Sequence, residues 1–137
     1  MIIKRKKGSK YNNKTVVYNG IKFVSKKEGQ RYLFLKKAEE DGKISELKTQ
    51  VKFELIPSIK EEYIEHLKTK DKTRVRTLQL AINYISDFTY IKDGLMVIED
   101  VKASPKVIPS DFKLKEKMFF WRYGNRIRRV FKANEEI

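Results

Sequence analysis

The chain has 137 residues, enough for one domain with its own hydrophobic core, and 40% of them are hydrophobic. It contains no cysteine, which excludes disulfide bonds, thiolate metal sites and a cysteine nucleophile. Lysine and arginine number 32 against 18 aspartate and glutamate, and the net charge of +14 favours a polyanionic partner such as nucleic acid. No segment resembles a signal peptide or a membrane span, so we expect a cytoplasmic protein without a membrane partner.

The chain is predicted to begin with a flexible basic arm over residues 1–13, followed by a single domain over residues 14–137. Four residues of this arm are expected to contact a phosphate backbone: Lys4, Arg5, Lys6 and Lys7. Residues 15–24 contain Asn19-Gly20 between two apolar runs, which predicts a β-hairpin. Ser25 then begins a helix capping box, and the predicted helix runs to about Asp41 with Gly42 as its stop.

Glu28 is the third residue after the predicted cap and has two interpretations. It can serve only to cap the start of the helix. It also lies at helical spacing with Tyr32 and Leu35, on the stripe that should face the sheet, where a carboxylate could reach a metal ion. The spacing leaves both interpretations open, and they do not exclude each other.

The middle of the chain is highly charged. Residues 51–55 alternate as a half-buried strand that Pro57 ends. The apolar positions of residues 59–67 predict one short amphipathic helix, and residues 68–76 are expected to form an exposed loop. His66, the only histidine, is expected to be a surface residue, so two-histidine zinc sites are excluded.

A second hairpin is predicted where residues 84–90 and 95–102 flank a loop with Asp93-Gly94. Each apolar run carries an acid, Asp87 in the first and Asp100 in the second, and a carboxylate inside such a strand needs a compensating cation or donors. Strand alternation places Asp100 and Lys102 on one face, while Glu99 points to the other.

The C-terminal part is predicted to contain a loop over residues 103–109, a helix capped by Ser110 or Asp111 and ended by Gly124, and a basic edge strand over residues 126–132. Together these elements predict an α/β (α+β) fold, in which helices pack on one mixed sheet.

A metal site is expected at the end of the second hairpin. Hard cations such as Mg²⁺ prefer carboxylate and carbonyl oxygens, which Asp87, Asp100, Glu28 and the Val101 carbonyl would supply. Lys102 could stabilise the charge of a phosphodiester transition state. Acid-x-Lys triplets also occur elsewhere in the chain, as at Asp41-Gly42-Lys43, so the hydrophobic strand before Asp100 carries this interpretation.

The pattern of these residues resembles the PD-(D/E)XK nuclease superfamily and, over residues 10–12, 20–28, 53–58, 84–90 and 99–102, the phage-encoded DUF1064 family. The resemblance implies an αβββαβ restriction-endonuclease-like core, Mg²⁺ or Mn²⁺ dependence and a DNA substrate. It assigns Asp87 and Asp100 as metal ligands, Lys102 as the catalytic lysine and Glu28 as the helix acid. Ser86 stands where the superfamily name has proline.

Small proteins with that core include Holliday junction resolvases, so the resemblance implies a structure-selective endonuclease acting on branched recombination intermediates, and a possible homodimer. Lys26, Lys113 and Lys117 are expected to contact DNA phosphates or to be solvated surface residues. The alternative hypothesis is a non-catalytic basic DNA-binding protein that retains the nuclease fold.

Overall fold

The computed structural model describes residues 14–137 as a single α+β domain, and the expected phosphate contacts at Lys4, Arg5, Lys6 and Lys7 lie outside these residues. Within the described part there are two helices and ten strands. In chain order they are β1 (Val16–Tyr18), β2 (Ile21–Phe23), α1 (Lys26–Glu40), β3 (Ser45–Thr49), β4 (Lys52–Ile56), β5 (Ile59–His66), β6 (Asp71–Gln79), β7 (Ile82–Ile85), β8 (Phe88–Lys92), β9 (Leu95–Val101), α2 (Ser110–Tyr123) and β10 (Ile127–Val130).

The body of the protein is built around a four-stranded mixed sheet with the order β10-β9-β8-β3. Strand β10 is parallel to β9, and the other neighbours are antiparallel. The predicted hairpin of β8 and β9 is confirmed, and its two turn residues, Asp93 and Gly94, have φ values of 51° and 77°, as a type I′ turn requires. The predicted basic edge strand is confirmed as β10.

The two helices cover opposite faces of this sheet. Phe88 and Tyr90 of β8 pack with Leu35 of α1 in one buried cluster. Ile98 of β9 packs with Phe112 and with other residues of α2 and β10 in a second cluster. Because side chains alternate along β9, Glu99 faces α1 while Asp100 faces α2.

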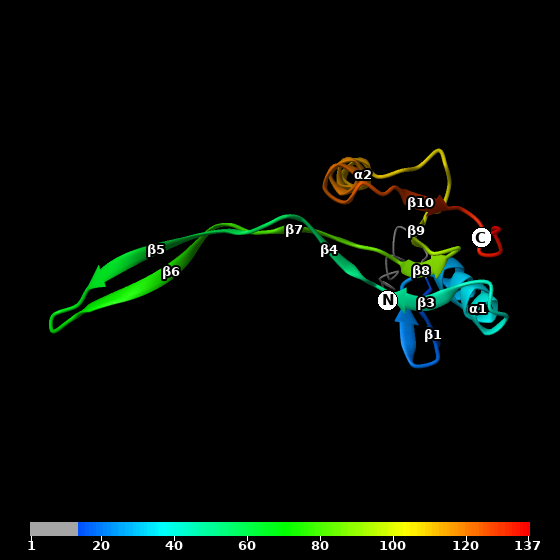
Figure 1. Cartoon of the computed structure of the whole chain (residues 1–137), viewed down its shortest axis with the longest axis horizontal. Helices are drawn as coiled ribbons and strands as arrows, with labels where there is room; N and C mark the ends of the chain where they lie inside the picture. Colours follow the sequence, from blue (N-terminus) through cyan, green and yellow to red (C-terminus); the bar gives the residue numbers. More distant parts are fainter. Residues whose placement is uncertain (1–13) are drawn as a thin grey trace, which may run out of the picture.

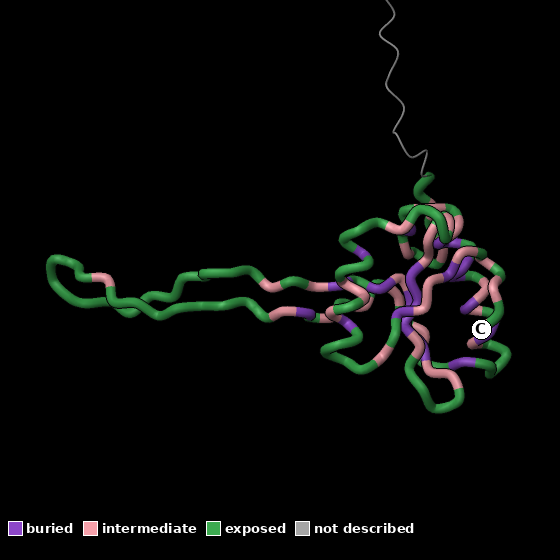
Figure 2. The backbone as a smooth tube through the Cα atoms, turned by 90° about the horizontal axis from the view of Figure 1, so that it is seen from above, coloured by how far each residue is buried: buried purple, intermediate pink, exposed green. Residues whose placement is uncertain are grey.

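A long two-stranded ribbon projects from the body (Figure 1). Its inner part pairs β4 with β7, and its outer part pairs β5 with β6 from Ile59 opposite Gln79 to His66 opposite Asp71. Figure 2 shows that the outer part is exposed along almost its whole length. The two parts are interrupted at Pro57, which has no backbone N–H to donate to a ladder.

This ribbon corrects the prediction for the middle of the chain: residues 59–67 are not a helix, and most of residues 68–76 form strand β6 and not a loop. The spacing of the apolar residues fits a helix, but the segment pairs with β6, whose β-branched Thr73, Val75 and Thr77 favour a strand. The short turn from Leu67 to Lys70 is closed by a hydrogen bond of 2.9 Å. His66 is exposed, as expected.

Three further expectations needed correction. The strands form four separate sheets and not one, and β3 was not predicted. The apolar run around Asp87 is divided into β7 and β8, with Ser86 and Asp87 between them. Helix α2 begins after Pro109, with no hydrogen bond from a capping side chain, because neither Ser110 nor Asp111 precedes the first turn.

The predicted hairpin over residues 15–24 and the helix after it are confirmed, whereas the predicted basic arm over residues 1–13 lies outside the described residues. Asn19 and Gly20 have φ values of 50° and 74° in the turn between β1 and β2. The Ser25 hydroxyl caps α1, which ends at Glu40 before Gly42. No helix in residues 14–137 is long and apolar enough to cross a membrane.

Candidate active site

The predicted hairpin acids lie in a pocket at the end of the central sheet, where β8 begins, β9 ends and α1 starts. The pocket has a volume of about 400 Å³. Its lining comprises Val24, Ser25, Lys27, Glu28, Asp87, Asp100, Val101, Lys102 and Ala103. Because these residues come from three separate elements, only the folded chain brings them together.

Asp87 is held beside β9 by its own backbone and side chain. The register pairs Phe88 with Glu99, which sets the preceding residue, Asp87, next to Asp100. The backbone N–H of Asp87 donates to the Glu99 carbonyl at 3.2 Å, and the backbone N–H of Val101 donates to Asp87 Oδ2 at 2.7 Å. The break between β7 and β8 therefore directs this carboxyl group into the pocket.

Asp100 is buried and has two partners on the α2 face of the sheet. Its Oδ1 lies 2.7 Å from Lys102 Nζ, which confirms that Asp100 and Lys102 share one face. Its Oδ2 accepts a hydrogen bond of 2.7 Å from the Tyr84 hydroxyl. Burial and the charge of Asp100 raise the pKa of Tyr84, so this hydroxyl stays protonated and remains a donor.

Glu28 combines the two interpretations that the sequence left open. Its backbone N–H donates to Ser25 Oγ at 3.2 Å, so the helix start is capped, while its carboxyl group is buried and lines the pocket. Burial raises the pKa of Glu28, and interaction with Asp87 partly opposes this shift. Burial, together with the charges of Asp100 and Glu28, raises the pKa of Asp87 to about 8. At pH 7 the protonated form of Asp87 is therefore favoured.

No group of three or more His, Cys, Asp or Glu side chains within residues 14–137 is arranged to hold a metal ion directly. Instead, Lys102 Nζ pairs with Asp100 Oδ1. The donor set itself fits a hard cation, because three carboxyl groups and the Val101 backbone line one pocket. Burial is the main cause of the raised pKa values of Glu28 and Asp87, so a bound cation would favour the charged form of both groups.

Two residues of the site were not predicted. Tyr84 fixes Asp100 through the hydrogen bond described above. Lys27 Nζ donates to the backbone carbonyls of Lys102 and Ala103 at 3.3 and 3.1 Å, so it ties α1 to the end of β9. Both were visible in the sequence as members of predicted elements, but nothing in their spacing indicated these long-range contacts.

Glu99 has a structural role, which agrees with the prediction that it points away from Asp100. Arg31 and Glu99 are both fully buried and form two hydrogen bonds, from Nε to Oε1 at 2.8 Å and from Nη2 to Oε2 at 2.7 Å. Tyr90 also donates to Glu99 at 2.8 Å. Glu99 is therefore compensated without a metal ion.

The predicted phosphate contacts lie on two surfaces. Lys26 is exposed at the start of α1, next to the pocket residue Lys27. Lys113 and Lys117 are exposed on α2 and line a different groove, between α2 and β10. The structure therefore does not bring these two lysines into the carboxylate pocket.

Fold and site together define a small α+β protein with a pocket of three acids and lysines at the end of a mixed sheet. The chain belongs to the family described as "Protein of unknown function (DUF1064)", whose model matches residues 8–135. No curated protein and no solved structure matches the chain.

Proposed function

We propose that this protein is a metal-dependent DNA endonuclease of the PD-(D/E)XK superfamily that acts on branched DNA in the manner of a phage Holliday junction resolvase. The observation that carries the proposal is the convergence of Glu28, Asp87 and Asp100 in one pocket with Lys102 paired to Asp100. A hydrolase acting on a phosphodiester needs carboxylates for a cation and a nearby positive charge for the phosphate.

The succession of elements supports the same proposal. Helix α1, strands β3, β8 and β9, helix α2 and strand β10 follow the order of an αβββαβ core, with the ribbon β4–β7 as an insertion between β3 and β8. Asp87 then directly precedes the second strand of that core and Asp100 lies on the third, in line with the metal ligands that the resemblance implies.

Each residue of the pocket has a proposed role. Asp87, Asp100, Glu28 and the Val101 carbonyl would hold Mg²⁺ or, as a substitute, Mn²⁺. Such a cation supplies Lewis-acid stabilisation of the charge that develops on the phosphate oxygens. Lys102 is held against Asp100 and over the Phe112 ring, 3.7 Å from its centroid, and would neutralise the phosphate. Lys27 and Tyr84 position the end of β9 and the Asp100 carboxylate.

DNA is the proposed substrate because the chain carries a net charge of +14. The preference for branched DNA and the possible homodimer come from the likeness to small resolvases, in which two symmetric cuts require two sites.

A non-catalytic DNA-binding protein is the second candidate. Two observations favour it: Lys102 is already paired with Asp100, and residues 14–137 contain no group arranged to hold a metal directly. In that case the protein would retain the nuclease fold and its pocket without catalytic activity.

Cleavage of a labelled four-way junction and of a matched linear duplex, in Mg²⁺, Mn²⁺ or chelator, tests the proposal. Asp100→Asn is the test variant. Asp41→Asn is the matched control, because Asp41 is an exposed acid in another Asp-x-Lys triplet. We expect junction cleavage that requires metal, falls at least about 100-fold in Asp100→Asn and is unchanged in Asp41→Asn.

Each other outcome selects a different conclusion. Equal cleavage of both DNAs would retain the nuclease and discard the preference for branched DNA. Full activity of Asp100→Asn would contradict the site. Junction binding without cleavage in either metal would support the non-catalytic candidate.

A further inference from the structure

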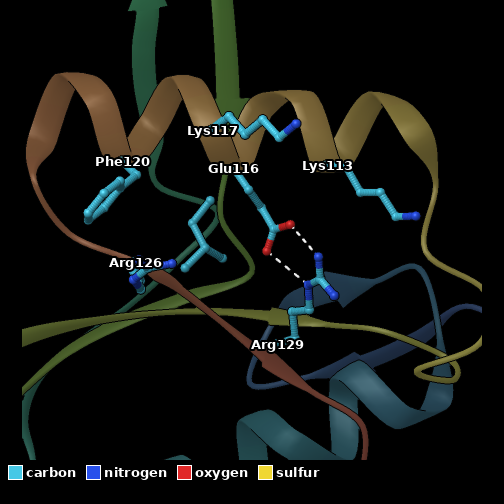
Figure 3. A pocket seen from close by; sticks show the side chains of 7 residues that line it. Lys113, Glu116, Lys117, Phe120, Arg126 and Arg129 are labelled. Carbon is cyan, nitrogen blue, oxygen red and sulfur yellow. Dashed lines mark hydrogen bonds and ion pairs between the residues drawn. The ribbon is translucent and has the colours of Figure 1, made fainter.

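A second, larger groove lies between α2 and β10 and is separate from the carboxylate pocket (Figure 3). Its volume is about 580 Å³. The helix contributes Lys113, Glu116, Lys117 and Phe120, which are spaced as one stripe of a helix, and the opposite wall contains Arg126 and Arg129.

The groove has an excess of positive charge that the described residues do not neutralise. Glu116 and Arg129 neutralise each other through two hydrogen bonds of 2.9 and 2.5 Å. Lys113, Lys117 and Arg126 form no ion pair with any residue of 14–137. The groove therefore attracts an anionic ligand.

Exposed aromatic rings accompany these cations. The Arg126 guanidinium lies 4.4 Å from the centroid of Phe120, whose residue is 46% exposed. Trp121 is 83% exposed and lies one helical turn after Lys117, on the same side of α2 as that lysine. A flat apolar ring beside free cations suits a ligand that carries both phosphates and flat rings, whereas an acidic peptide would use only the cations.

The groove adjoins the candidate active site. Arg129 of β10 is in register with Asp100 of β9, so their backbones lie on neighbouring strands. The Phe112 ring lies between the two sites, with Lys102 Nζ at 3.7 Å and Arg129 Cζ at 5.9 Å from its centroid. A ligand in the groove is therefore close to the carboxylates.

We propose that this groove binds single-stranded DNA, with phosphates at Lys113, Lys117 and Arg126 and an unpaired base stacked on Trp121. The inference rests on the proposed function for its role, because unpaired nucleotides beside a branch point would then be held next to Asp100. The part of the substrate that the protein recognises is then the unpaired bases at the branch and not a continuous duplex.

The chain offers a direct probe, since Trp121 is its only tryptophan and its fluorescence reports on this part of α2. We would titrate the full chain with oligothymidylate and with a matched duplex in chelator, where no metal-dependent cleavage occurs. Quenching of Trp121 fluorescence by oligothymidylate, well below the duplex concentration needed for the same effect, is expected.

Variants measured by anisotropy of labelled oligothymidylate separate stacking from charge. Trp121→Ala should weaken binding at least about five-fold, and Trp121→Phe should restore most of it. Lys117→Gln should weaken binding and reduce the slope of log K against log salt by about 0.7, whereas the control Lys48→Gln, on the opposite edge strand, should change neither. All three positions are exposed, and circular dichroism checks that each variant is folded.

The groove assignment is overturned if Trp121 fluorescence does not respond, if duplex and oligothymidylate quench equally, or if polyglutamate displaces the oligonucleotide as effectively as DNA does. Failure of the nuclease proposal is distinguishable. Single-strand binding with no cleavage of any DNA would support the groove and reject the nuclease. Junction cleavage that is unaffected by Trp121→Ala would support the nuclease and reject the groove.

Discussion

The buried pair of Arg31 and Glu99 gives the sharpest prediction of stability. Arg31→Met would leave Glu99 fully buried with only the Tyr90 hydroxyl at 2.8 Å and Arg128 Nη1 at 3.7 Å as compensation. Breaking a buried ion pair on one side destabilises a protein by about 3–5 kcal/mol. Because two partners of Glu99 remain, we expect a loss near the lower limit, about 3 kcal/mol.

Urea unfolding followed by far-ultraviolet circular dichroism measures this loss. The double variant Arg31→Met/Glu99→Gln keeps an acceptor for Tyr90 and removes the uncompensated charge, so it should lose at least about 1 kcal/mol less than the sum of the single variants. Lys36→Met is the control, since its ion pair with Glu39 on the same helix is partly exposed, and it should leave the unfolding midpoint unchanged. Additive single losses, or equal losses for Arg31→Met and Lys36→Met, would refute the reasoning.

Three further predictions concern the site, the ribbon and the packing of α1. The raised pKa of Asp87, about 8, means that the folded state holds this proton more tightly than the unfolded state does, so without metal the free energy of unfolding should decrease as the pH rises from 5 to 8. The contribution of Asp87 to this slope is at most about 1.4 kcal/mol per pH unit, and Asp87→Asn should reduce the slope in urea titrations at each pH. A free energy of unfolding that rises with pH over this range would contradict a raised pKa of Asp87. Replacing residues 59–79 by a short glycine–serine turn should change the thermal midpoint by only a few degrees, because neither buried cluster contains a residue from β5 or β6. Loss of cooperative unfolding in this variant would show that the ribbon contributes to the packing of the body. Gly29→Ala would place a Cβ 2.5 Å from Val16 Cγ2 and should destabilise the protein by about 1–2 kcal/mol, whereas the control Gln30→Ala, at an exposed position, should not lower the thermal midpoint.

Local sequence signals predicted the elements whose geometry depends on neighbouring residues. Asn19-Gly20 and Asp93-Gly94 adopt the left-handed conformations that tight hairpins need, and Ser25 caps the helix that Gly42 follows. The ribbon of β5 and β6 was missed because its residues are exposed on both faces, so no alternation of buried and exposed positions marks its strands.

In the candidate site, too, contacts between neighbouring residues could be predicted and contacts between distant residues could not. Alternation along one strand was enough to predict that Asp100 and Lys102 share a face. The roles of Tyr84 and Lys27 depend on contacts with residues 16 and 75 positions away in the chain, which no local pattern encodes. The groove between α2 and β10 was missed for the same reason, because Arg126 contacts Phe120 only when β10 lies along α2 in the folded chain.

The pocket of Glu28, Asp87 and Asp100 is proposed to hold a divalent cation, and calorimetric titration of Mn²⁺ at pH 7 in two buffers of different ionisation enthalpy tests this binding most directly. Because Asp87, with a pKa of about 8, must lose its proton to bind a cation, we predict release of about one proton for each Mn²⁺ bound. Asp87→Asn should abolish both the binding and the proton release. Absence of binding to the unchanged protein, or binding without proton release and with equal affinity in Asp87→Asn, would contradict the account.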